Sequence, residues 1–327
     1  MKVTFFQRKP MTDNFSLEKV FETVRQYLPK NIQSTIHIAP YKSKGILPRI
    51  YNLLEAPYYQ GDVNHITGDI HYVGYFLHKK KTILTILDCG FLQQPMSKIS
   101  RFIIRFFWYV IPVTRSQVIT TISESTKQDI VKITHCRPEK VKVIPVGVSP
   151  LFKFSNKTFN TELPTILHIG TAYNKNLINL IKALHDIKCK LVIVGHLNQE
   201  QLDMLKQKKI DYANYFNLTD EAIVRMYESA DIVSFISIFE GFGMPIIEAN
   251  AIGRPVITSN LSPMKDAAGE AACLVNPHDQ ASIREGILRI INDAKYRTKL
   301  IHAGQENIKK YLPEKIAEDY AELYRSL

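Results

Sequence analysis

The chain has 327 residues, of which 45% are hydrophobic and 22% charged, with 42 Lys and Arg against 31 Asp and Glu. This composition is that of an ordinary globular protein, and it excludes a disordered, collagen-like or multi-span membrane protein. The charge is uneven, because residues 1–152 hold 21 basic and 10 acidic side chains while residues 153–327 hold 21 of each. We therefore expect the first half to meet an anionic partner: a phosphorylated substrate, an acidic membrane surface or nucleic acid.

The cysteines and the apolar runs indicate the compartment. The four cysteines lie far apart, so the sequence has no CxxC pair, and we expect reduced thiols. The longest apolar run, 102–113, is interrupted by Arg105 and is short of the ~20 residues that span a bilayer. Arg8 and Lys9 follow the first apolar residues too early for a signal peptide. We expect a cytoplasmic protein that is at most peripheral on the membrane.

Short β-rich runs alternate with helical patterns along the first half. Strands are predicted at 2–7, 34–38, 63–66, 82–87, 118–122 and 141–146. After Ser16, apolar residues recur at helical spacing from Leu17 to Leu28. This alternation predicts a parallel sheet with helices on both faces.

The rhythm stops at 149–164, a stretch of mixed polarity with two prolines that we interpret as a linker. Strands are then predicted at 165–169, 190–194, 212–216, 231–236 and 255–259, with helices between them, and two long helical patterns close the chain. The fold class is therefore α/β, with two Rossmann-like doubly wound domains facing a central cleft. We expect domains at 1–152 and 153–313, and a last helix at 314–327.

One basic segment of the first half combines charge with aromatic residues. Lys98, Arg101 and Arg105 fall on one face of a predicted helix, among bulky apolar residues from Ile99 to Val110. Such a helix suits a membrane interface or an anionic acceptor. The alternative is a core helix with one solvated basic face. Nucleic acid is not expected, because no known nucleic-acid module is present.

The stretch 239–249, FEGFGMPIIEA, follows a strand and leads into a helix. Gly241 and Gly243 let the backbone approach a ligand, and Pro245 suits the first helical turn. The helix start offers free N–H groups to a phosphate. Glu240 and Glu248 flank this turn, where they could hold the hydroxyls of two sugars, or could simply be solvated.

The loop Gly170–Asn176 also joins a strand to a helix. Lys175 stands near the helix start, where a cation suits a diphosphate, although an ordinary solvated lysine fits too. In the first half, His65, Asp69, His71 and Asp88 lie at or after strand ends, so they are candidate catalytic or acceptor contacts, with structural histidines as the alternative.

Together these segments resemble the nucleotide-sugar-binding half of family 4 glycosyltransferases of the GT-B fold. The matching stretches are LHIGTAYNKNL (167–177), LVIVG (191–195), residues 218–260 and AACLVNP (271–277), and the spacing of Glu240 and Glu248 is the family's hallmark. The first half matches at 118–133 and 141–152, but it lacks the family's glycine loop after the first strand, and Leu87 and Thr67 stand where histidines are frequent.

The resemblance implies a role for each matching residue. Glu248 would bind the ribose, Glu240 the transferred sugar, and Lys175 the diphosphate, with Thr171 at a position that is often arginine. The remaining expected donor contacts are Gly170, Asn176, Phe216, Asn217, Leu218, Gly241, Phe242, Gly243 and Met244.

The resemblance also implies the reaction. We expect transfer of a hexose-type sugar from a UDP- or GDP-linked donor to a hydroxyl of a glycan or lipid-linked glycan, with retention, in polysaccharide or glycolipid biosynthesis. No cofactor and no metal are expected, because the sequence has no Asp-x-Asp. The alternatives are a non-catalytic nucleotide-sugar-binding subunit and a GT-B sugar-nucleotide epimerase.

Overall fold

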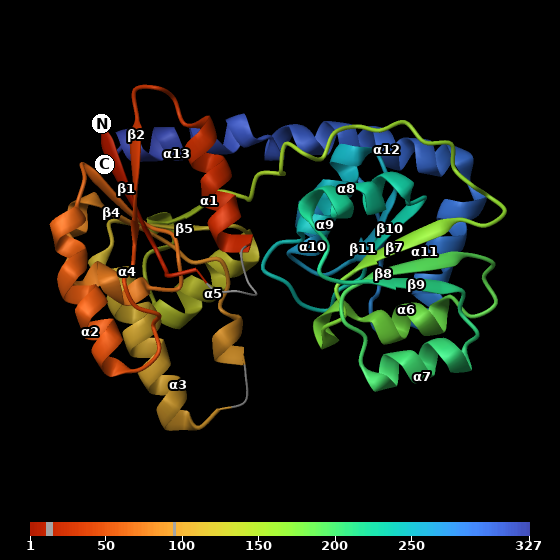
Figure 1. Ribbon diagram of the computed structural model, residues 1–327, viewed down its shortest axis with the longest axis horizontal. Helices are drawn as coiled ribbons and strands as arrows, with labels where there is room; N and C mark the ends of the chain where they lie inside the picture. Colours follow the sequence, from red (N-terminus) through yellow and green to blue (C-terminus); the bar gives the residue numbers. More distant parts are fainter. Residues whose placement is uncertain (11–15, 94–95) are drawn as a thin grey trace. The chain divides into compact units, whose positions relative to one another are not determined.

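The computed structural model describes residues 1–10, 16–93 and 96–327, and these divide into two compact units (Figure 1). Unit 1 comprises Met1–Gly147 together with Pro313–Leu327, and unit 2 is Val148–Leu312. Among the described residues, no helix has both the length and the apolar character needed to cross a membrane.

Unit 1 is a parallel six-stranded sheet in the order β2-β1-β3-β4-β5-β6. Its strands are β1 (Lys2–Gln7), β2 (Gln33–Ile38), β3 (Val63–Ile66), β4 (Thr82–Thr85), β5 (Val118–Thr121) and β6 (Val141–Val143). Its helices are α1 (Ser16–Tyr27), α2 (Ile46–Glu55), α3 (Lys98–Ile104), the π-helical η5 (Arg105–Val110), α4 (Ile111–Arg115), α5 (Glu124–Thr134) and α13 (Pro313–Arg325). β6 ends earlier than predicted, because Pro145 has no N–H to donate to a sheet.

The last helix completes the core of unit 1. Figure 1 shows α13 beside α1, at the end of the unit that holds β1. Tyr320 and Tyr324 of α13 are buried with Phe5 and Phe21 from the beginning of the chain. The final residues therefore supply apolar surface that the first sheet needs.

Unit 2 is a second parallel six-stranded sheet, in the order β12-β11-β10-β7-β8-β9. Its strands are β7 (Thr165–Ile169), β8 (Lys190–Val194), β9 (Tyr212–Tyr215), β10 (Ile232–Phe235), β11 (Val256–Ser259) and β12 (Ala272–Val275). Its helices are α6 (Leu177–Ala183), α7 (Gln199–Gln207), α8 (Asp220–Ser229), α9 (Met244–Ile252), α10 (Met264–Ala268), α11 (Gln280–Asn292) and α12 (Ala294–Ile308). In the part of the chain that the structure describes, the three helices α11, α12 and α13 come last, whereas the sequence predicted two.

The extra boundary lies at Asp293, which ends α11 and whose side chain accepts a hydrogen bond from the backbone N–H of Tyr296 in α12. An aspartate in this position starts a new helix rather than extending the old one. The stretch 149–164 contains no helix or strand, as the linker interpretation predicted. The strand β12 and the short helix α10 were not among the predicted elements.

The strand order of unit 2 determines where a ligand can bind. Counted from β7, the chain adds β8 and β9 on one side and then β10, β11 and β12 on the other. The loops after β7 and β10 therefore leave the sheet in opposite directions. In doubly wound sheets, ligands bind in the crevice at this reversal, beyond the carboxyl ends of the strands.

Candidate active site

Both segments that the sequence singled out lie at this reversal in unit 2. Gly170–Asn176 follows β7, and the loop that contains Glu240 follows β10. These two strands are direct neighbours, with Leu167 paired to Val233. The topology thus brings together residues that are about 65 positions apart in the chain.

Hydrogen bonds from two asparagines hold the two loops together. Asn174 donates from Nδ2 to the carbonyl of Phe239 (3.0 Å) and to Glu240 Oε1 (3.1 Å), and its own carbonyl accepts from the N–H of Ile238 (2.9 Å). Asn176 donates to the carbonyls of Ile236 (3.1 Å) and Pro277 (2.7 Å). The loops are therefore built as one rigid support.

This use of Asn176 corrects an expectation. Its side chain is buried, and its Oδ1 accepts from Asn179 (2.9 Å), so both ends of the amide are engaged within the protein. Asn176 shapes the loop and does not offer its side chain to a donor. Asn174, which sequence reasoning passed over, takes part in holding Glu240, and its place inside the matched stretch LHIGTAYNKNL was the available signal.

Lys175 and Glu240 form the charged centre of the site. Lys175 Nζ lies 2.5 Å from Glu240 Oε1, and both side chains are largely but not fully buried. The ammonium also lies 4.9 Å from the centre of the Phe235 ring. Gly170 has a φ of +92°, and a Cβ there would come within 2.9 Å of Lys175 Cγ, so only glycine lets the lysine stem lie across the loop.

Glu248 lies one helical turn inside α9 and is held by a second residue. The hydroxyl of Tyr227, a buried residue of α8, donates to Glu248 Oε2 at 2.5 Å. Burial raises the pKa of the Glu248 carboxyl to about 7, while the Tyr227 hydrogen bond and the charge of Lys175 lower that pKa. Sequence reasoning passed over Tyr227, and its place inside the matched stretch 218–260 was the available signal.

The beginning of α9 is open to an anion. Gly243 precedes the helix with a φ of +128°, and no side chain caps the helix. Within the first turn, Pro245 has no N–H and the N–H of Ile246 donates to the carbonyl of Gly243 (3.0 Å), so the N–H of Met244 is the first one left for a ligand. The Phe242 ring is buried against Tyr311, so this residue can offer a ligand only its backbone. Contacts of a phosphate with the backbone N–H groups of Gly241, Phe242, Gly243 and Met244 stay a prediction.

The other expected donor contacts lie along the same sheet edge. Thr171 donates from its hydroxyl to the carbonyl of His196 (2.6 Å) after β8. Phe216 follows β9 and is half exposed, with its ring centre 4.4 Å from that of His196. Asn217 and Leu218 come next, and Asn217 has a left-handed backbone with φ of +54°. An exposed flat surface is therefore available for a base beyond β8 and β9.

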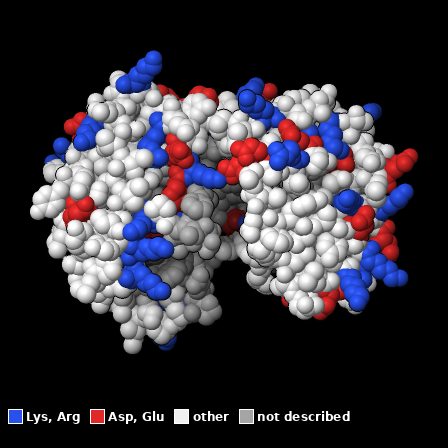
Figure 2. Space-filling model, viewed as in Figure 1, with Lys and Arg blue, Asp and Glu red and all other residues white. Residues whose placement is uncertain are grey.

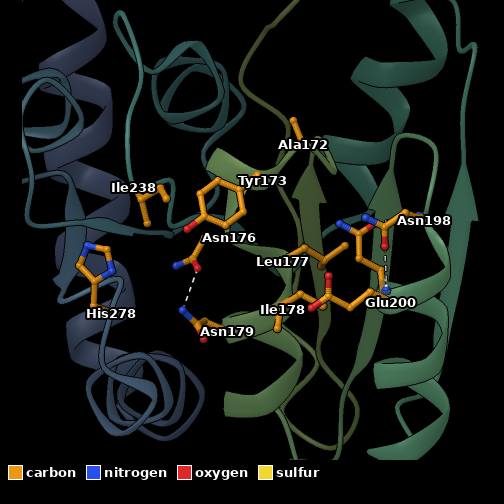
Figure 3. Close-up of a pocket in the computed structure, with 11 residues that line it drawn as sticks. Ala172, Tyr173, Asn176, Leu177, Ile178, Asn179, Asn198, Glu200, Ile238 and His278 are labelled. Carbon is orange, nitrogen blue, oxygen red and sulfur yellow. Dashed lines mark hydrogen bonds between the residues drawn. The ribbon is translucent and has the colours of Figure 1, made fainter. Parts of the chain in front are cut away.

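A pocket of about 260 Å³ lies on the flank of the loop after β7 (Figure 3). Tyr173 and Asn176 border it from that loop, His278 from the loop before α11, and Glu200 from α7. It includes Asn176 but neither Lys175, Glu240 nor Glu248. This pocket is therefore separate from the charged centre.

Comparison with known proteins identifies the unit that carries this geometry. Residues 152–307 match the model of a family described as Glycosyl transferases group 1. The chain carries a group 1 glycosyl transferase domain. The resemblance expected from the sequence is confirmed, and the Lys175–Glu240 pair lies inside this group 1 domain.

Curated relatives resemble the chain beyond the group 1 domain. An uncharacterised glycosyltransferase of Methanocaldococcus jannaschii is 26% identical over 72% of this chain and 66% of its own length. A capsular polysaccharide biosynthesis glycosyltransferase of Staphylococcus aureus is 27% identical, over 64% of this chain and 61% of its own. The alignments thus span about three fifths to two thirds of these relatives.

Solved structures agree over almost the whole chain. A glycosyltransferase from Rickettsia africae superimposes with a TM-score of 0.77 at 17% identity, covering 99% of this chain and 98% of its own. An Anabaena protein solved with UDP and glucose superimposes with a TM-score of 0.74 at 15% identity, covering 100% of both chains. These likenesses show the fold: the two parallel six-stranded sheets are those of GT-B glycosyltransferases.

Outside the group 1 domain, unit 1 has its own reversal between β1 and β3. Asp69 follows β3, and its carboxylate is mostly exposed, 3.1 Å from the guanidinium of Arg8 after β1. His71 is buried and donates from Nδ1 to the carbonyl of Trp108 (2.9 Å). Burial lowers the pKa of His71, whereas that hydrogen bond and the charges of Asp69 and Asp88 raise it. Asp88 itself accepts from the N–H of Gly90 (2.9 Å).

His65 is a core residue, and the expectation that it contacts substrate is wrong. Its Nδ1 lies 2.7 Å from the Tyr324 hydroxyl, and its Nε2 lies 2.7 Å from the Thr85 hydroxyl. The ring is fully buried, which lowers its pKa to about 3. His65 is inside β3 with both nitrogens engaged, so the structural alternative is the correct one.

The basic face predicted for 98–105 is only partly present. Arg105 begins η5, and it donates to the carbonyl of Ile133 (2.7 Å) and lies 2.9 Å from His135 Nε2, so it holds the end of α5. Lys98 and Arg101 are exposed on α3. The alternative of a core helix is correct for part of this stretch: α3 has no fully buried residue, but its Ile104 packs against the core of unit 1, and Tyr109 of η5 is buried in that core.

Proposed function

We propose that this protein transfers a hexose-type sugar from a nucleoside-diphosphate sugar, UDP- or GDP-linked, to a hydroxyl of a glycan or lipid-linked glycan. The observation that carries the proposal is the Lys175–Glu240 pair at the reversal of the unit 2 sheet, beside the uncapped start of α9. Several curated relatives are named mannosyltransferases, and one structural neighbour was solved with UDP-glucose, which supports this class of donor.

The charges of the site suit departure of a diphosphate. When the glycosidic bond breaks, the leaving nucleoside diphosphate gains negative charge. Lys175 and the N–H groups at the start of α9 are fixed where they would stabilise that charge. Glu240 already lies against Lys175, so donor binding would place a phosphate oxygen against the ammonium and a sugar hydroxyl against the carboxylate.

Glu248 has a separate proposed role. Its carboxyl is positioned by Tyr227 and would accept hydrogen bonds from the ribose hydroxyls, while Phe216 would offer a face to the base. We further propose that the reaction retains the anomeric configuration and needs no metal or other cofactor. It would serve cell-surface polysaccharide or glycolipid synthesis on the cytoplasmic side of a membrane.

The test is release of nucleoside diphosphate by the purified protein from a panel of UDP- and GDP-linked hexoses, with binding measured in parallel by calorimetry. Lys175→Ala should lower kcat/KM at least about a hundredfold with the preferred donor. Lys309→Ala is the matched control, since it removes the lysine of another ion pair in unit 2, with Glu306, on the surface.

Absence of binding to every donor would refute the proposal. Binding without turnover, in the presence of glycan acceptors, would instead indicate a nucleotide-sugar-binding subunit. A changed sugar nucleotide in the absence of any acceptor would indicate an epimerase.

A further inference from the structure

Helix α2 of unit 1 turns most of its apolar residues outward. Five apolar side chains recur at helical spacing and are exposed, Ile46, Leu47, Ile50, Tyr51 and Leu54, whereas Leu53 is partly buried against the core of unit 1. Ile46 and Leu47 expose 75% and 78% of their surface. The one buried residue of this helix is Asn52, whose amide bonds Tyr41 and the Tyr72 hydroxyl. A helix that packs on a core normally buries such a row of apolar side chains, whereas α2 leaves most of them exposed.

Helix α3 and the π-helical η5 show the same feature. The exposed apolar side chains again follow helical spacing and are Ile99, Phe102, Ile103, Phe106 and Phe107. Ile99 exposes 74% of its surface and Phe102 exposes 65%. The rings of Phe102 and Phe106 stack in parallel, with centroids 6.1 Å apart. A second row of large apolar groups is therefore held in order at the surface, with Phe102 and Phe106 bordering Thr134 and His135 at the end of α5.

The two helices are joined within unit 1. The guanidinium of Arg49 in α2 lies 5.4 Å from the centre of the Trp108 ring in η5. Tyr72 lies between them, since its ring is 5.7 Å from that of Trp108 and its hydroxyl bonds Asn52. Because Asn52, Tyr72 and Trp108 fix both helices to the same region, we call the ten exposed apolar residues named above the apolar face.

The charges near the apolar face are mostly basic. Residues 41–55 and 96–115 contain seven basic residues and one acidic residue, Glu55 at the end of α2, whose largely buried carboxylate lies 3.0 Å from His37 Nε2. Of these, Lys42, Lys44, Arg49, Lys98 and Arg101 are exposed. In Figure 2 the surface of unit 1 over α2 is largely white, with a red group on it and a group of blue side chains beside it. Apolar rows with basic residues beside them match a lipid surface that carries anionic headgroups.

We propose that the apolar face and its flanking lysines and arginines dock unit 1 on an anionic membrane, with the apolar side chains at the boundary of headgroups and acyl chains. A second copy of the chain fits less well. A twofold interface sets the same patch against itself, so it would bring these positive charges against one another. An anionic lipid surface removes that repulsion and also covers the apolar rows.

Vesicle flotation tests the proposal with the full chain and without donor or acceptor, so the result is separable from that of the donor assay. We expect the protein to float with vesicles of phosphatidylcholine and phosphatidylglycerol, and not with phosphatidylcholine alone. Each basic residue near an anionic surface contributes about fivefold to partitioning. Lys98→Glu/Arg101→Glu should therefore lower partitioning about 25-fold or more.

Matched control variants show whether partitioning depends on the apolar face or on charged and apolar residues elsewhere on the molecule. Lys206→Glu/Lys209→Glu makes the same charge change on exposed lysines at the end of α7 in unit 2, and it should leave partitioning unchanged. Leu47→Ser and Phe102→Ser should each lower partitioning about tenfold without affecting the fold, since both side chains are exposed. Leu202→Ser on α7 is the apolar control.

Three results would overturn the proposal. The first is failure of the wild-type chain to float with anionic vesicles. The second is equal loss of partitioning in the α7 controls, which would show non-specific attraction. The third is a lipid-free dimer, detected by light scattering, that Leu47→Ser converts to monomers, which would show that a second copy covers the face. If circular dichroism shows that Leu47→Ser or Phe102→Ser does not fold, the comparison of Lys98→Glu/Arg101→Glu with Lys206→Glu/Lys209→Glu tests the proposal without the apolar variants.

Discussion

Substitution of Glu248 by glutamine should raise the stability of unit 2 at alkaline pH. The pKa of this carboxyl is raised from 4.5 to about 7 in the folded protein, so the native state binds the proton more tightly than the unfolded state does. Glu248 therefore costs nothing below about pH 4.5. The cost grows as the pH rises and is complete above about pH 7.

The size of this cost follows from the shift. A difference of about 2.5 pH units corresponds to about 3 kcal/mol, and the part of Glu248 that stays exposed to solvent lowers this to about 2 kcal/mol. Glutamine carries no charge and still accepts the Tyr227 hydrogen bond. The variant should thus equal the wild type at pH 4.5 and exceed its stability by about 2 kcal/mol at pH 8.

Hydrogen exchange of peptides from α9, measured by mass spectrometry across urea concentrations, reports this difference. Fluorescence of Trp108, the one tryptophan, would follow unit 1 instead. Equal stability of the two proteins at pH 8 would refute the reasoning, as would a stability difference that does not change with pH. Weaker donor binding by the more stable variant would show that Glu248 is retained for function at a cost in stability.

Three further predictions concern single residues. Glu240→Ala should reduce turnover at least about a hundredfold while the free energy of unfolding falls by only about 1 to 3 kcal/mol, because the pair with Lys175 is largely buried, and an equally active variant would remove Glu240 from the site. Gly170→Ala should weaken donor binding about tenfold by displacing Lys175, whereas Gly45→Ala, at the same positive φ but with no atom closer than 3.9 Å, should leave it unchanged in calorimetry. Because burial lowers the pKa of His65 to about 3, the stability of unit 1 present above pH 6.5 should fall by about 1.4 kcal/mol per pH unit on acidification toward pH 3. Trp108 fluorescence in urea should follow this loss, and a slope that His65→Gln leaves unchanged would contradict it.

The two loops that carry Lys175 and Glu240 were predictable because their signals are local. Gly243 and Pro245 mark a turn into a helix, and Gly170 marks the turn that Lys175 crosses. The alternation of strands and helices then implied a doubly wound sheet, in which such loops gather at the carboxyl ends of the strands. The sequence therefore predicted the fold class and placed Lys175 and Glu240 on loops at one edge of the sheet, while their contact with each other was found only in the structure.

The rest depended on contacts between distant residues. The sequence around His65 does not show whether its side chain faces a ligand or the core. The hydrogen bond with Tyr324, which is 259 positions away in the chain, shows that it faces the core. Tyr227 is likewise an ordinary helical tyrosine until α8 and α9 are packed together. An apolar stripe such as that of α2 predicts a buried helix face, so its exposure could be learned only from the structure.

A crystal structure of the protein with a bound UDP- or GDP-hexose tests the central claim most directly. We expect the diphosphate within hydrogen-bonding distance of Lys175 Nζ and of the first N–H groups of α9, the sugar against Glu240, and the ribose against the carboxyl of Glu248. A donor bound elsewhere on the chain, with the Lys175–Glu240 pair intact and uncovered, would contradict the claim.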